Sequence, residues 1–272
     1  MSNNTYRPLS GKTAFVTGSG RGLGNAIAHK LASQGANIIL HDQTFDSPSV
    51  FGEAKDLNEA EAKFAEYDID TMQLIGNIGD EKTVQGWADQ VTNRIGNIDI
   101  LVNAAGGDIG AAGKGKPVPN DALHIPIADL QAEVERNLIG TMLVCRSFVP
   151  PMVERKSGSI VFISSVAAHL GVSPEVTYAT CKAAIIHYAR CLALEMRDHN
   201  VRVNVVSPGA TRSARFMATR KTDPAMMAEE GLKRYGLPKD IANAVAFFAS
   251  DEASFVSGQV LRVDGGWALF PG

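Results

Sequence analysis

The feature that most limits the fold of this chain is a regular alternation of short apolar runs with helix-length segments. The runs are rich in β-branched residues and span 13–17, 37–41, 72–75, 98–102, 159–164, 202–206 and 259–263. Such an alternation predicts βαβ units and a parallel sheet. Runs such as IVFIS and VRVNVV carry few polar residues, as expected of strands that helices cover on both faces. We therefore predict a doubly wound α/β fold.

Length and composition narrow the class of protein further. With 272 residues the chain can bury a substantial core within one α/β domain, so we predict a single domain over 1–272, with residues 1–10 as an N-terminal extension. A net charge of −3 gives no basic excess for nucleic acid or an anionic membrane. The N-terminal segment lacks the apolar region of a secretory signal, and no run is long enough to span a membrane. We expect a cytoplasmic protein with no membrane or nucleic-acid partner.

Cysteine usage gives no sign of a disulfide or a metal site. The chain has three cysteines, Cys145, Cys181 and Cys191, all in segments with a helical pattern. Their spacing matches no set of metal ligands, so we interpret them as reduced packing residues and predict no bound metal.

A cluster of four glycines follows the first apolar run, in the segment FVTGSGRGLG at 15–24. It fits either a flexible surface turn or a phosphate-binding turn in which the backbone N–H groups approach a dinucleotide. Its position between a strand and a helix, within a βαβ unit, favours the second interpretation. The spacing departs from G-x-G-x-x-G because Leu23 stands where the last glycine belongs. The candidate phosphate-binding residues are Gly18, Ser19, Gly20, Arg21, Gly22, Leu23 and Gly24.

Further motifs follow in register with this turn. They are NAAG at 103–106, Ser165, YATCK at 178–182 and SPG at 207–209. Together with TGSGRGLG they resemble the short-chain dehydrogenase/reductase family, in order and spacing, from about residue 11 to 266. The resemblance implies a Rossmann-like domain with a seven-stranded parallel sheet in the order 3-2-1-4-5-6-7. It also implies an enzyme with a nicotinamide cofactor and a homotetramer built by pairing two long helices.

Tyr178 and Lys182 are four residues apart, so on a helix they share one face. A nearby ammonium group should lower the pKa of the phenol toward the range in which acid–base catalysis is efficient. The resemblance implies that Lys182 also holds the nicotinamide ribose, and that Ser165, rather than Ser164, orients the substrate oxygen. It further implies that Asn137 supports a proton-relay water near the lysine.

Asp42, at the end of the second strand, indicates the cofactor. A carboxylate there can accept hydrogen bonds from the adenosine ribose hydroxyls and would repel a 2′-phosphate, so we predict NAD rather than NADP. Arg21 could instead meet a 2′-phosphate, although the family carries this arginine with either cofactor. The resemblance adds further cofactor-binding positions: Asn77, Ile78, Asn103, Ala104, Ala105, Gly106, Pro208, Gly209 and Thr211.

The substrate is less well specified. The long loop at 106–126 and a lid expected at 211–230 should border its site, with candidate contacts His169, Val172, Lys114, Lys116, Arg212, Arg215 and His124. Cations around one cleft suit a small anionic molecule such as a hydroxy, keto or sugar acid. Alternatively, the two lysines only solvate the loop, and methionines 217, 226 and 227 fill a core. Trp267 and Phe270 near the C-terminus suggest a subunit contact.

Three functions are compatible with these residues. The first is NAD-dependent interconversion of a secondary alcohol and a ketone on a small polar substrate. A second is reduction of a 3-oxoacyl thioester on an acyl carrier protein, a role that usually consumes NADPH and is therefore disfavoured by Asp42. The third is a non-catalytic NAD sensor or scaffold, which would have no use for Ser165, Tyr178 and Lys182.

Overall fold

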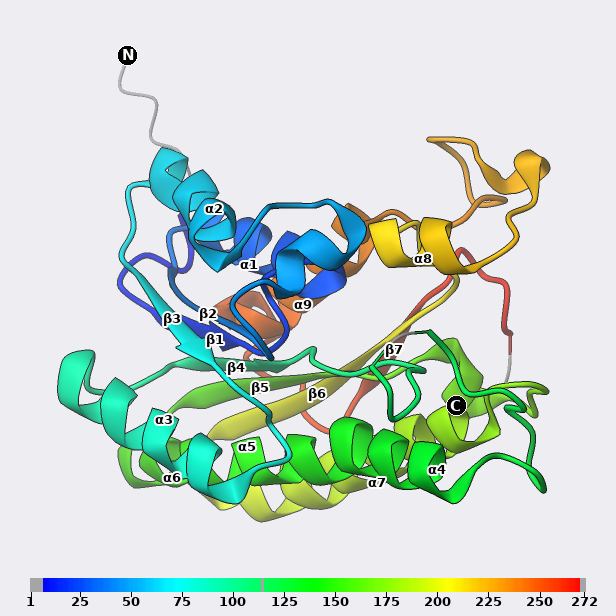
Figure 1. Ribbon diagram of the computed structural model, residues 1–272. Helices are drawn as coiled ribbons and strands as arrows, with labels where there is room; N and C mark the ends of the chain where they lie inside the picture. Colours follow the sequence, from blue (N-terminus) through cyan, green and yellow to red (C-terminus); the bar gives the residue numbers. More distant parts are fainter. Residues whose placement is uncertain (1–6, 114, 270–272) are drawn as a thin grey trace.

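A computed structural model of the chain describes residues 7–113 and 115–269, and within them one sheet of seven parallel strands forms the centre of the molecule (Figure 1). The strand order is β3-β2-β1-β4-β5-β6-β7, which confirms the predicted topology. The strands are β1 (Thr13–Val16), β2 (Asn37–Asp42), β3 (Thr71–Ile75), β4 (Ile100–Asn103), β5 (Gly158–Ile163), β6 (Val201–Pro208) and β7 (Val260–Val263).

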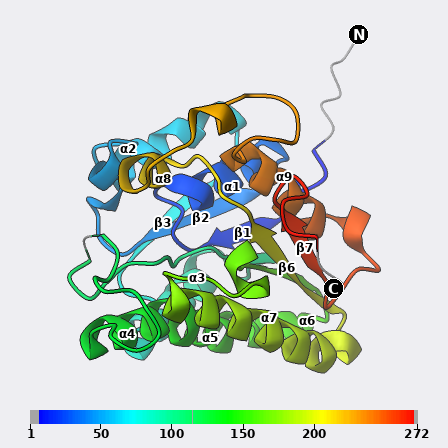
Figure 2. The ribbon, with the colours of Figure 1, turned by 90° about the vertical axis from the view of Figure 1, so that its right-hand side faces the viewer.

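Helices cover both faces of this sheet, as Figures 1 and 2 show from two directions. One face carries α1 (Gly22–Ser33), α2 (Leu57–Ala62) and α9 (Pro238–Ala249). The other carries α3 (Glu81–Arg94), α4 (Ile127–Val134), α5 (Gly140–Phe148), α6 (Pro150–Arg155) and α7 (Val176–Met196). A short π-helical segment, η3 (Glu135–Ile139), joins α4 to α5.

Alternate residues of each central strand serve two separate apolar layers. Phe15 and Ile39 are fully buried against the side of α3, α5 and α7, whereas Val16 and Leu40 are fully buried against the side of α1 and α9. Because both faces of the strand are buried, the apolar runs lack the polar alternation of a half-exposed strand. The two-sided core therefore explains the composition from which the sheet was predicted.

The order of the strands places a cleft at their carboxyl ends. β1 has β2 on one side and β4 on the other, so the chain reverses its direction of winding at β1. Loops that follow strands on either side of such a point diverge and leave a crevice, which is where ligands bind in open α/β sheets. The loops after β1, β2, β4, β5 and β6 all reach this crevice.

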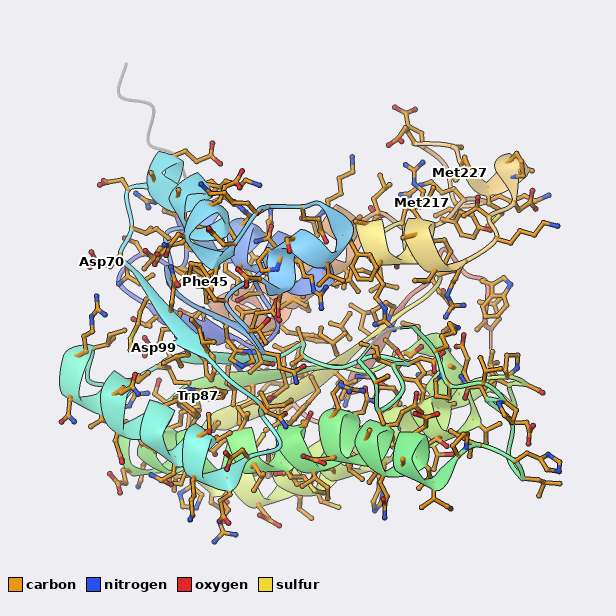
Figure 3. All side chains as sticks on the ribbon, viewed as in Figure 1. Phe45, Asp70, Trp87, Asp99, Met217 and Met227 are labelled. Carbon is orange, nitrogen blue, oxygen red and sulfur yellow. The ribbon has the colours of Figure 1, made fainter. Side chains whose placement is uncertain are left out.

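The segment after β6 extends away from the sheet, and its two ends lie side by side. Thr211 forms a parallel bridge with Gly236, and the Arg212 N–H donates to the Gly236 carbonyl at 2.8 Å. Between these positions lie α8 (Ala214–Thr219) and η6 (Pro224–Met226), and we refer to residues 212–235 as the lid segment. Met217 is 43% exposed, and Figure 3 places Met217 and Met227 out on this segment, so the interpretation of these methionines as core filler is wrong.

Two further expectations need adjustment. Cys145 and Cys181 are buried, but Cys191 is exposed on α7, so it is not a packing residue. Of the expected extension at 1–10, residues 1–6 lie outside the described residues, whereas Leu9 is fully buried in the core beside α1. Among the helices that the structure describes, none has both the length and the apolar character needed to cross a membrane.

Candidate active site

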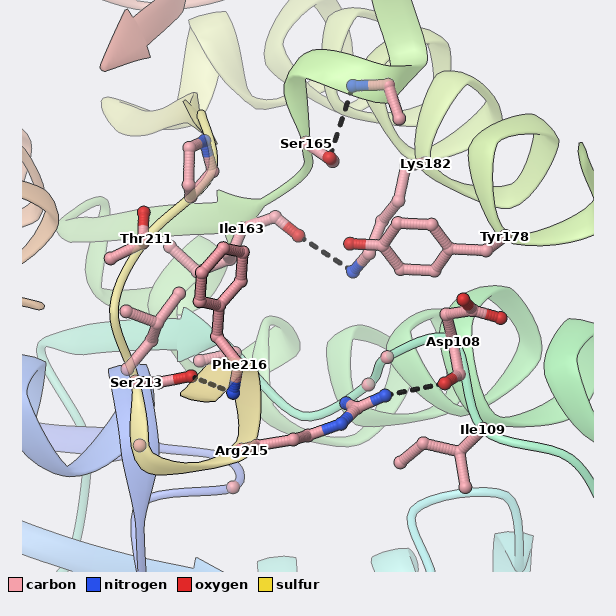
Figure 4. A pocket seen from close by; sticks show the side chains of 18 of the residues that line it. Asp108, Ile109, Ile163, Ser165, Tyr178, Lys182, Thr211, Ser213, Arg215 and Phe216 are labelled. Carbon is pink, nitrogen blue, oxygen red and sulfur yellow. Dashed lines mark hydrogen bonds between the residues drawn. The ribbon is translucent and has the colours of Figure 1, made fainter. Parts of the chain in front are cut away.

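A cleft of about 730 Å³ extends from the glycine turn to the lid segment (Figure 4 shows part of it). It collects most of the residues predicted from the sequence. Those that line it are Gly18, Arg21, Gly22, Leu23, Gly24, Asp42, Asn77, Ile78, Ala104, Ala105, Gly106, Lys116, Ser165, Val172, Tyr178, Lys182, Pro208, Gly209, Thr211 and Arg215.

The glycine turn is packed tightly on three sides. A Cβ at Gly18 would lie 2.9 Å from the backbone of Ala105, and one at Gly20 would lie 2.7 Å from Oδ2 of Asp42. A Cβ at Gly24 would collide with the Gly18 carbonyl. By contrast, Gly22 has a φ of +62° and open space around it. Packing therefore excludes side chains at three positions, while backbone conformation favours glycine at Gly22.

His41 holds this turn in place from beneath. Its Nδ1 accepts a hydrogen bond from the Gly18 N–H at 3.0 Å, and its backbone N–H donates to Ser19 Oγ at 2.9 Å. Burial lowers the pKa of His41 to about 4, so the ring is neutral at pH 7 and its Nδ1 can accept this hydrogen bond. Ser19, predicted as a cofactor contact, is fully buried and serves instead to fix the turn. Gly20 likewise packs against Asp42 instead of lining the cleft.

Asp42 presents a buried oxygen that accepts no hydrogen bond from the residues that the structure describes. Its Oδ1 accepts from the Gln43 N–H at 2.8 Å, whereas Oδ2 makes no hydrogen bond with any described residue and lies 4.0 Å from Nε of Arg21. Burial raises the pKa of Asp42, against the opposing effects of the Gln43 N–H and the Arg21 charge. Because an unsatisfied buried oxygen is unfavourable, a ligand hydroxyl at this place would be stabilised. The residues here fit the ribose of a dinucleotide.

Glu53 approaches the same end of the cleft and was not singled out in the sequence. Its Oε1 accepts from the Gly22 N–H at 2.8 Å, at the N-terminus of α1. Its other oxygen is buried and makes no hydrogen bond with the described residues. A helix N-terminus attracts anions, so this carboxylate takes the position that suits a phosphate group. Its loop after β2 gave no sequence signal for such a contact.

Tyr178, Lys182 and Ser165 meet in the middle of the cleft (Figure 4). Lys182 Nζ lies 5.7 Å from the centre of the Tyr178 ring and donates to the Ile163 carbonyl at 2.9 Å. Ser165 begins a short 3₁₀ helix, Val166–His169, and accepts from the Ala167 N–H at 3.2 Å. Its neighbour Ser164 donates instead to the Lys182 carbonyl at 2.8 Å, which ties β5 to α7. Only Ser165 of this pair is therefore free to face the tyrosine.

The expected lowering of the tyrosine pKa by Lys182 is not observed in this structure. Burial raises the pKa of Tyr178, and the effects that oppose burial come from a hydrogen bond with Ser165 and the positive charge of Arg215. Burial also lowers the pKa of Lys182, to about 8, so the amine itself is held closer to neutrality than expected. The phenol is therefore protonated at neutral pH in this state.

Asn137 lies beneath the loop that follows β4 instead of lining the cleft. Its Oδ1 accepts from the Gly107 N–H at 2.7 Å, and its Nδ2 donates to the Gly107 carbonyl at 3.1 Å. A Cβ at Gly106 would lie 2.6 Å from Asn137 Oδ1 and 3.3 Å from Lys182 Nζ, so only glycine fits between them. The surrounding π-helical segment is a feature often found at functional sites.

The far end of the cleft is lined with charged groups that already have partners. Arg215 reaches from α8 across the cleft and donates from Nη2 to the Asp108 carbonyl at 2.5 Å (Figure 4). Lys116 pairs with Asp108 at 2.9 Å and also with Glu175. Arg220 donates to Glu175 at 2.7 Å. These contacts link the long loop, the start of α7 and the lid segment in one polar network.

Several sequence candidates lie elsewhere. His169 does not line the cleft among the described residues, because its Nε2 bonds Ser207 Oγ at 3.1 Å. Arg212 turns into the lid, where it donates to the Met227 carbonyl at 3.0 Å. His124 is exposed and pairs with Asp121. Asn103 donates to Cys145 Sγ at 3.5 Å inside the core, which suits its packing role. The structure thus removes His169, Arg212 and His124 from the cleft.

Two of the predicted aromatic and basic candidates lie outside the described residues, namely Lys114 and Phe270. Trp267, which was expected at a subunit contact, borders the cleft and is 68% exposed. The charged residues Asp108 and Glu175 also line the cleft and were missed. Asp108 directly follows the NAAG motif and a second glycine, which is the one sequence signal that could have indicated it.

The fold and the cleft define a dinucleotide-binding oxidoreductase. A family model described as enoyl-(acyl carrier protein) reductase matches residues 18–268. The 7alpha-hydroxysteroid dehydrogenase of Escherichia coli is 33% identical over 98% of each chain. A 3-oxoacyl-(acyl-carrier-protein) reductase of Aquifex aeolicus is 34% identical over 95% of this chain and 98% of its own length. The chain belongs to the short-chain dehydrogenase/reductase family.

Solved structures agree with this assignment. A 7 alpha-hydroxysteroid dehydrogenase complexed with NADH and 7-oxo glycochenodeoxycholic acid superposes with a TM-score of 0.83, at 31% identity and 98% coverage of both chains. A protein of Agrobacterium tumefaciens provisionally assigned as a gluconate dehydrogenase has a TM-score of 0.82 and 25% identity, with 97% of this chain and 99% of that chain covered. The family and the NADH-bound neighbour support NAD as the cofactor.

Proposed function

We propose that this protein interconverts a secondary alcohol and a ketone on a small, polar, anionic substrate, with NAD as cofactor. The observation that carries the proposal is the junction of Tyr178, Lys182 and Ser165 in one cleft whose far end carries Arg215. NAD, when bound, supplies the hydride acceptor or donor of the reaction. Its adenosine ribose would be held by Asp42 and its phosphates by the N–H groups near Gly22.

We assign the proton-transfer role to Tyr178. Its hydroxyl is protonated at neutral pH in this structure, so it has a proton to donate to a carbonyl oxygen, and the hydrogen bond with Ser165 and the charge of Arg215 oppose the rise of its pKa on burial. Ser165 orients that oxygen, because it lies beside the phenol and its neighbour Ser164 is committed to the Lys182 carbonyl. Lys182 is fixed by the Ile163 carbonyl, so its charge stays beside the ring. Asn137 supports this arrangement by holding Gly107, and we keep its water-binding role as a prediction.

Arg215 is the residue that favours an anionic substrate. Its guanidinium crosses the cleft and, among the described residues, donates to a backbone carbonyl on the far side, so a carboxylate can replace that neutral partner with a stronger, charge-assisted one. Lys116 is less available, because Asp108 and Glu175 already neutralise it. The likeness to the provisionally assigned gluconate dehydrogenase agrees with a hydroxy or sugar acid.

Reduction of 3-oxoacyl thioesters remains the second candidate, because the Aquifex aeolicus reductase is 34% identical to this chain. The two functions differ in substrate size and cofactor. A panel of sugar acids, hydroxy acids, secondary alcohols and a 3-oxoacyl thioester, each assayed with NAD(H) and NADP(H) by cofactor absorbance, separates them. We expect turnover of an acid with NAD, whereas exclusive turnover of the thioester with NADPH would overturn the proposal.

We also propose that the protein is a cytoplasmic homotetramer. Cys145, Cys181 and Cys191 are all free thiols, as is usual in a reducing compartment. Leu194 on α7 is 73% exposed and Phe255 before β7 is fully exposed, so an apolar side chain is available at each of these places for contact between subunits. Light scattering of the purified protein tests the tetramer directly.

A further inference from the structure

Residues 133–137, at the junction of α4 and η3, hold loop residues 107–109, which line the cleft. Asn137 bonds both backbone groups of Gly107, and Arg136 Nη1 donates to the Ile109 carbonyl at 2.6 Å. The residue between these two loop positions, Asp108, meets the carboxyl group of Glu133. Positions 133, 136 and 137 share one helical face, so each of three consecutive loop residues has its own anchor on that face.

The contact between Glu133 and Asp108 joins two acids in a buried place. Glu133 is fully buried and Asp108 is 4% exposed. Two ionised carboxylates at hydrogen-bonding distance repel each other, whereas one proton between them makes a strong bond. No donor side chain among the described residues bonds Glu133, and the Ile109 N–H is the backbone donor that acts on it, so a proton on Glu133 itself best satisfies its contact with Asp108.

The surroundings decide which of the two acids is ionised. Asp108 accepts from Asn120 Nδ2 at 2.8 Å and pairs with Lys116 Nζ at 2.9 Å, and these contacts lower its pKa. Burial and the neighbouring Asp108 together raise the pKa of Glu133 to about 8, against the opposing effects of the Arg136 charge and the Ile109 N–H. Asp108 is therefore the charged member of the pair and Glu133 the protonated one.

We propose that Glu133 is a positioning residue for the reaction: it donates a shared proton to Asp108 and thereby holds residues 107–109 where Arg215 docks and where Gly106 meets Lys182. Glu133 touches neither the cleft nor the substrate and acts through Asp108, whose carbonyl receives Arg215. The kinetic part of this inference rests on the proposed function, whereas the proton on Glu133 does not.

The pH dependence follows from the groups that face Glu133. These are Asp108 and Lys116 from the loop, Arg136 from the next helical turn, and Cys181 on α7. Loss of the shared proton above about pH 8 would leave two buried carboxylates in contact. Between the ordinary glutamate pKa, near 4.3, and about 8, the folded chain keeps a proton that the unfolded chain has lost, so the Glu133 contribution to stability decreases as pH rises through this window.

Infrared difference spectroscopy tests the proton directly and needs no substrate. The parent protein minus Glu133→Gln should show a protonated carboxyl C=O band at pH 7 that disappears as pH rises through about 8. The matched control is Asp129→Asn, because Asp129 lies on the same helix and bonds the same loop through the Ala111 N–H at 2.7 Å, but it is partly exposed. A parent spectrum without a carboxyl band that Glu133→Gln removes would overturn the proposal, whatever the activity.

Kinetics test the positioning role. Glu133→Gln keeps a donor toward Asp108, so we expect its KM at pH 7 to stay within about twofold of the parent and to remain level above pH 8, where the parent KM rises. Glu133→Leu lacks the donor and should raise KM by about tenfold at pH 7. Identical pH profiles of KM for the parent and Glu133→Gln would exclude the role, even if the leucine variant fails to fold. If no substrate of the panel is turned over, the proposed function is contradicted, and the infrared result alone then decides whether Glu133 carries the proton.

Discussion

The two ends of the cleft differ in how their polar groups are satisfied. At the end beside β2, Asp42 Oδ2 is buried and accepts no hydrogen bond from the described residues, and it lies beside a turn in which packing excludes side chains at Gly18 and Gly24. At the end beneath the lid, Lys116 forms ion pairs with Asp108 and Glu175, and Arg220 forms an ion pair with Glu175. The first end is therefore prepared to receive a ligand, whereas a ligand at the second must replace existing contacts. This difference predicts a fixed cofactor site and a substrate site that depends on the lid.

The largest expected effect is at the point where the two ends meet. Tyr178→Phe removes the hydroxyl that we assign to proton transfer while keeping the ring in place. We expect kcat to fall by roughly 10²–10⁴-fold, with NAD affinity unchanged. Steady-state kinetics and a separate NAD binding titration measure the two quantities. Retention of more than a tenth of the parent kcat would show that another group carries the proton.

The second test concerns the prepared end. Asp42→Ala removes the carboxylate whose Oδ2 accepts no hydrogen bond from the described residues, so the contact with the ribose is lost and the repulsion of a 2′-phosphate disappears. We expect the ratio of kcat/KM for NAD over NADP to fall by about 10–100-fold. Assays of both cofactors at equal substrate concentration give the ratio. Equal use of both cofactors by the unmutated protein would contradict the assignment before any variant is made.

The third test concerns the satisfied end. Arg215→Ala should raise KM for a carboxylate substrate by about tenfold, because one charge-assisted hydrogen bond is lost. An uncharged ester of the same substrate serves as the control and should show little change between the parent and the variant. A KM that is unchanged for the acid would remove Arg215 from substrate binding and break the contrast between the two ends.

The smallest effect is expected at Glu53, because its carboxylate occupies the place where the cofactor phosphates should bind. Glu53→Gln removes the negative charge at the N-terminus of α1, where the phosphates of the cofactor should bind. We expect NAD to bind about two- to fivefold more tightly, as measured by calorimetry. Glu59→Gln is a matched control. Glu59 lies on the nearby α2, its carboxylate also accepts a hydrogen bond from a backbone N–H, that of Lys55, and it lies outside the cleft. Tighter binding in both variants would indicate a general charge effect.

The sequence predicted the sheet well because its central strands are buried on both faces, which leaves a composition that few other arrangements require. The glycine turn, Asp42 and the Tyr178–Lys182 pair could also be placed, since each lies within one or two residues of a strand end or on a single helical turn. Leu9 was placed in a polar extension, although it is buried beside α1, because an isolated leucine gives no periodic signal.

The substrate end was harder to predict because its contacts join segments distant in the sequence. Arg212 and His169 were chosen for their charge and position, but their side chains turn toward Met227 and Ser207. Glu133 was missed because a glutamate in a helix usually faces solvent. Its spacing of four from Asn137, and of eight from the buried Thr141, places it on the buried stripe of the helix, and that periodicity was the available signal.

The bridge between Thr211 and Gly236 has a consequence for how such enzymes diversify. The chain between these residues starts and ends at one point, so its length and sequence can change without moving β6 or α9. Exchange of the whole lid segment between relatives should therefore transfer a preference for one kind of substrate and leave the position of Tyr178 unchanged. Because both ends of the segment meet at one bridge, substrate recognition can be replaced as a unit without altering the catalytic residues.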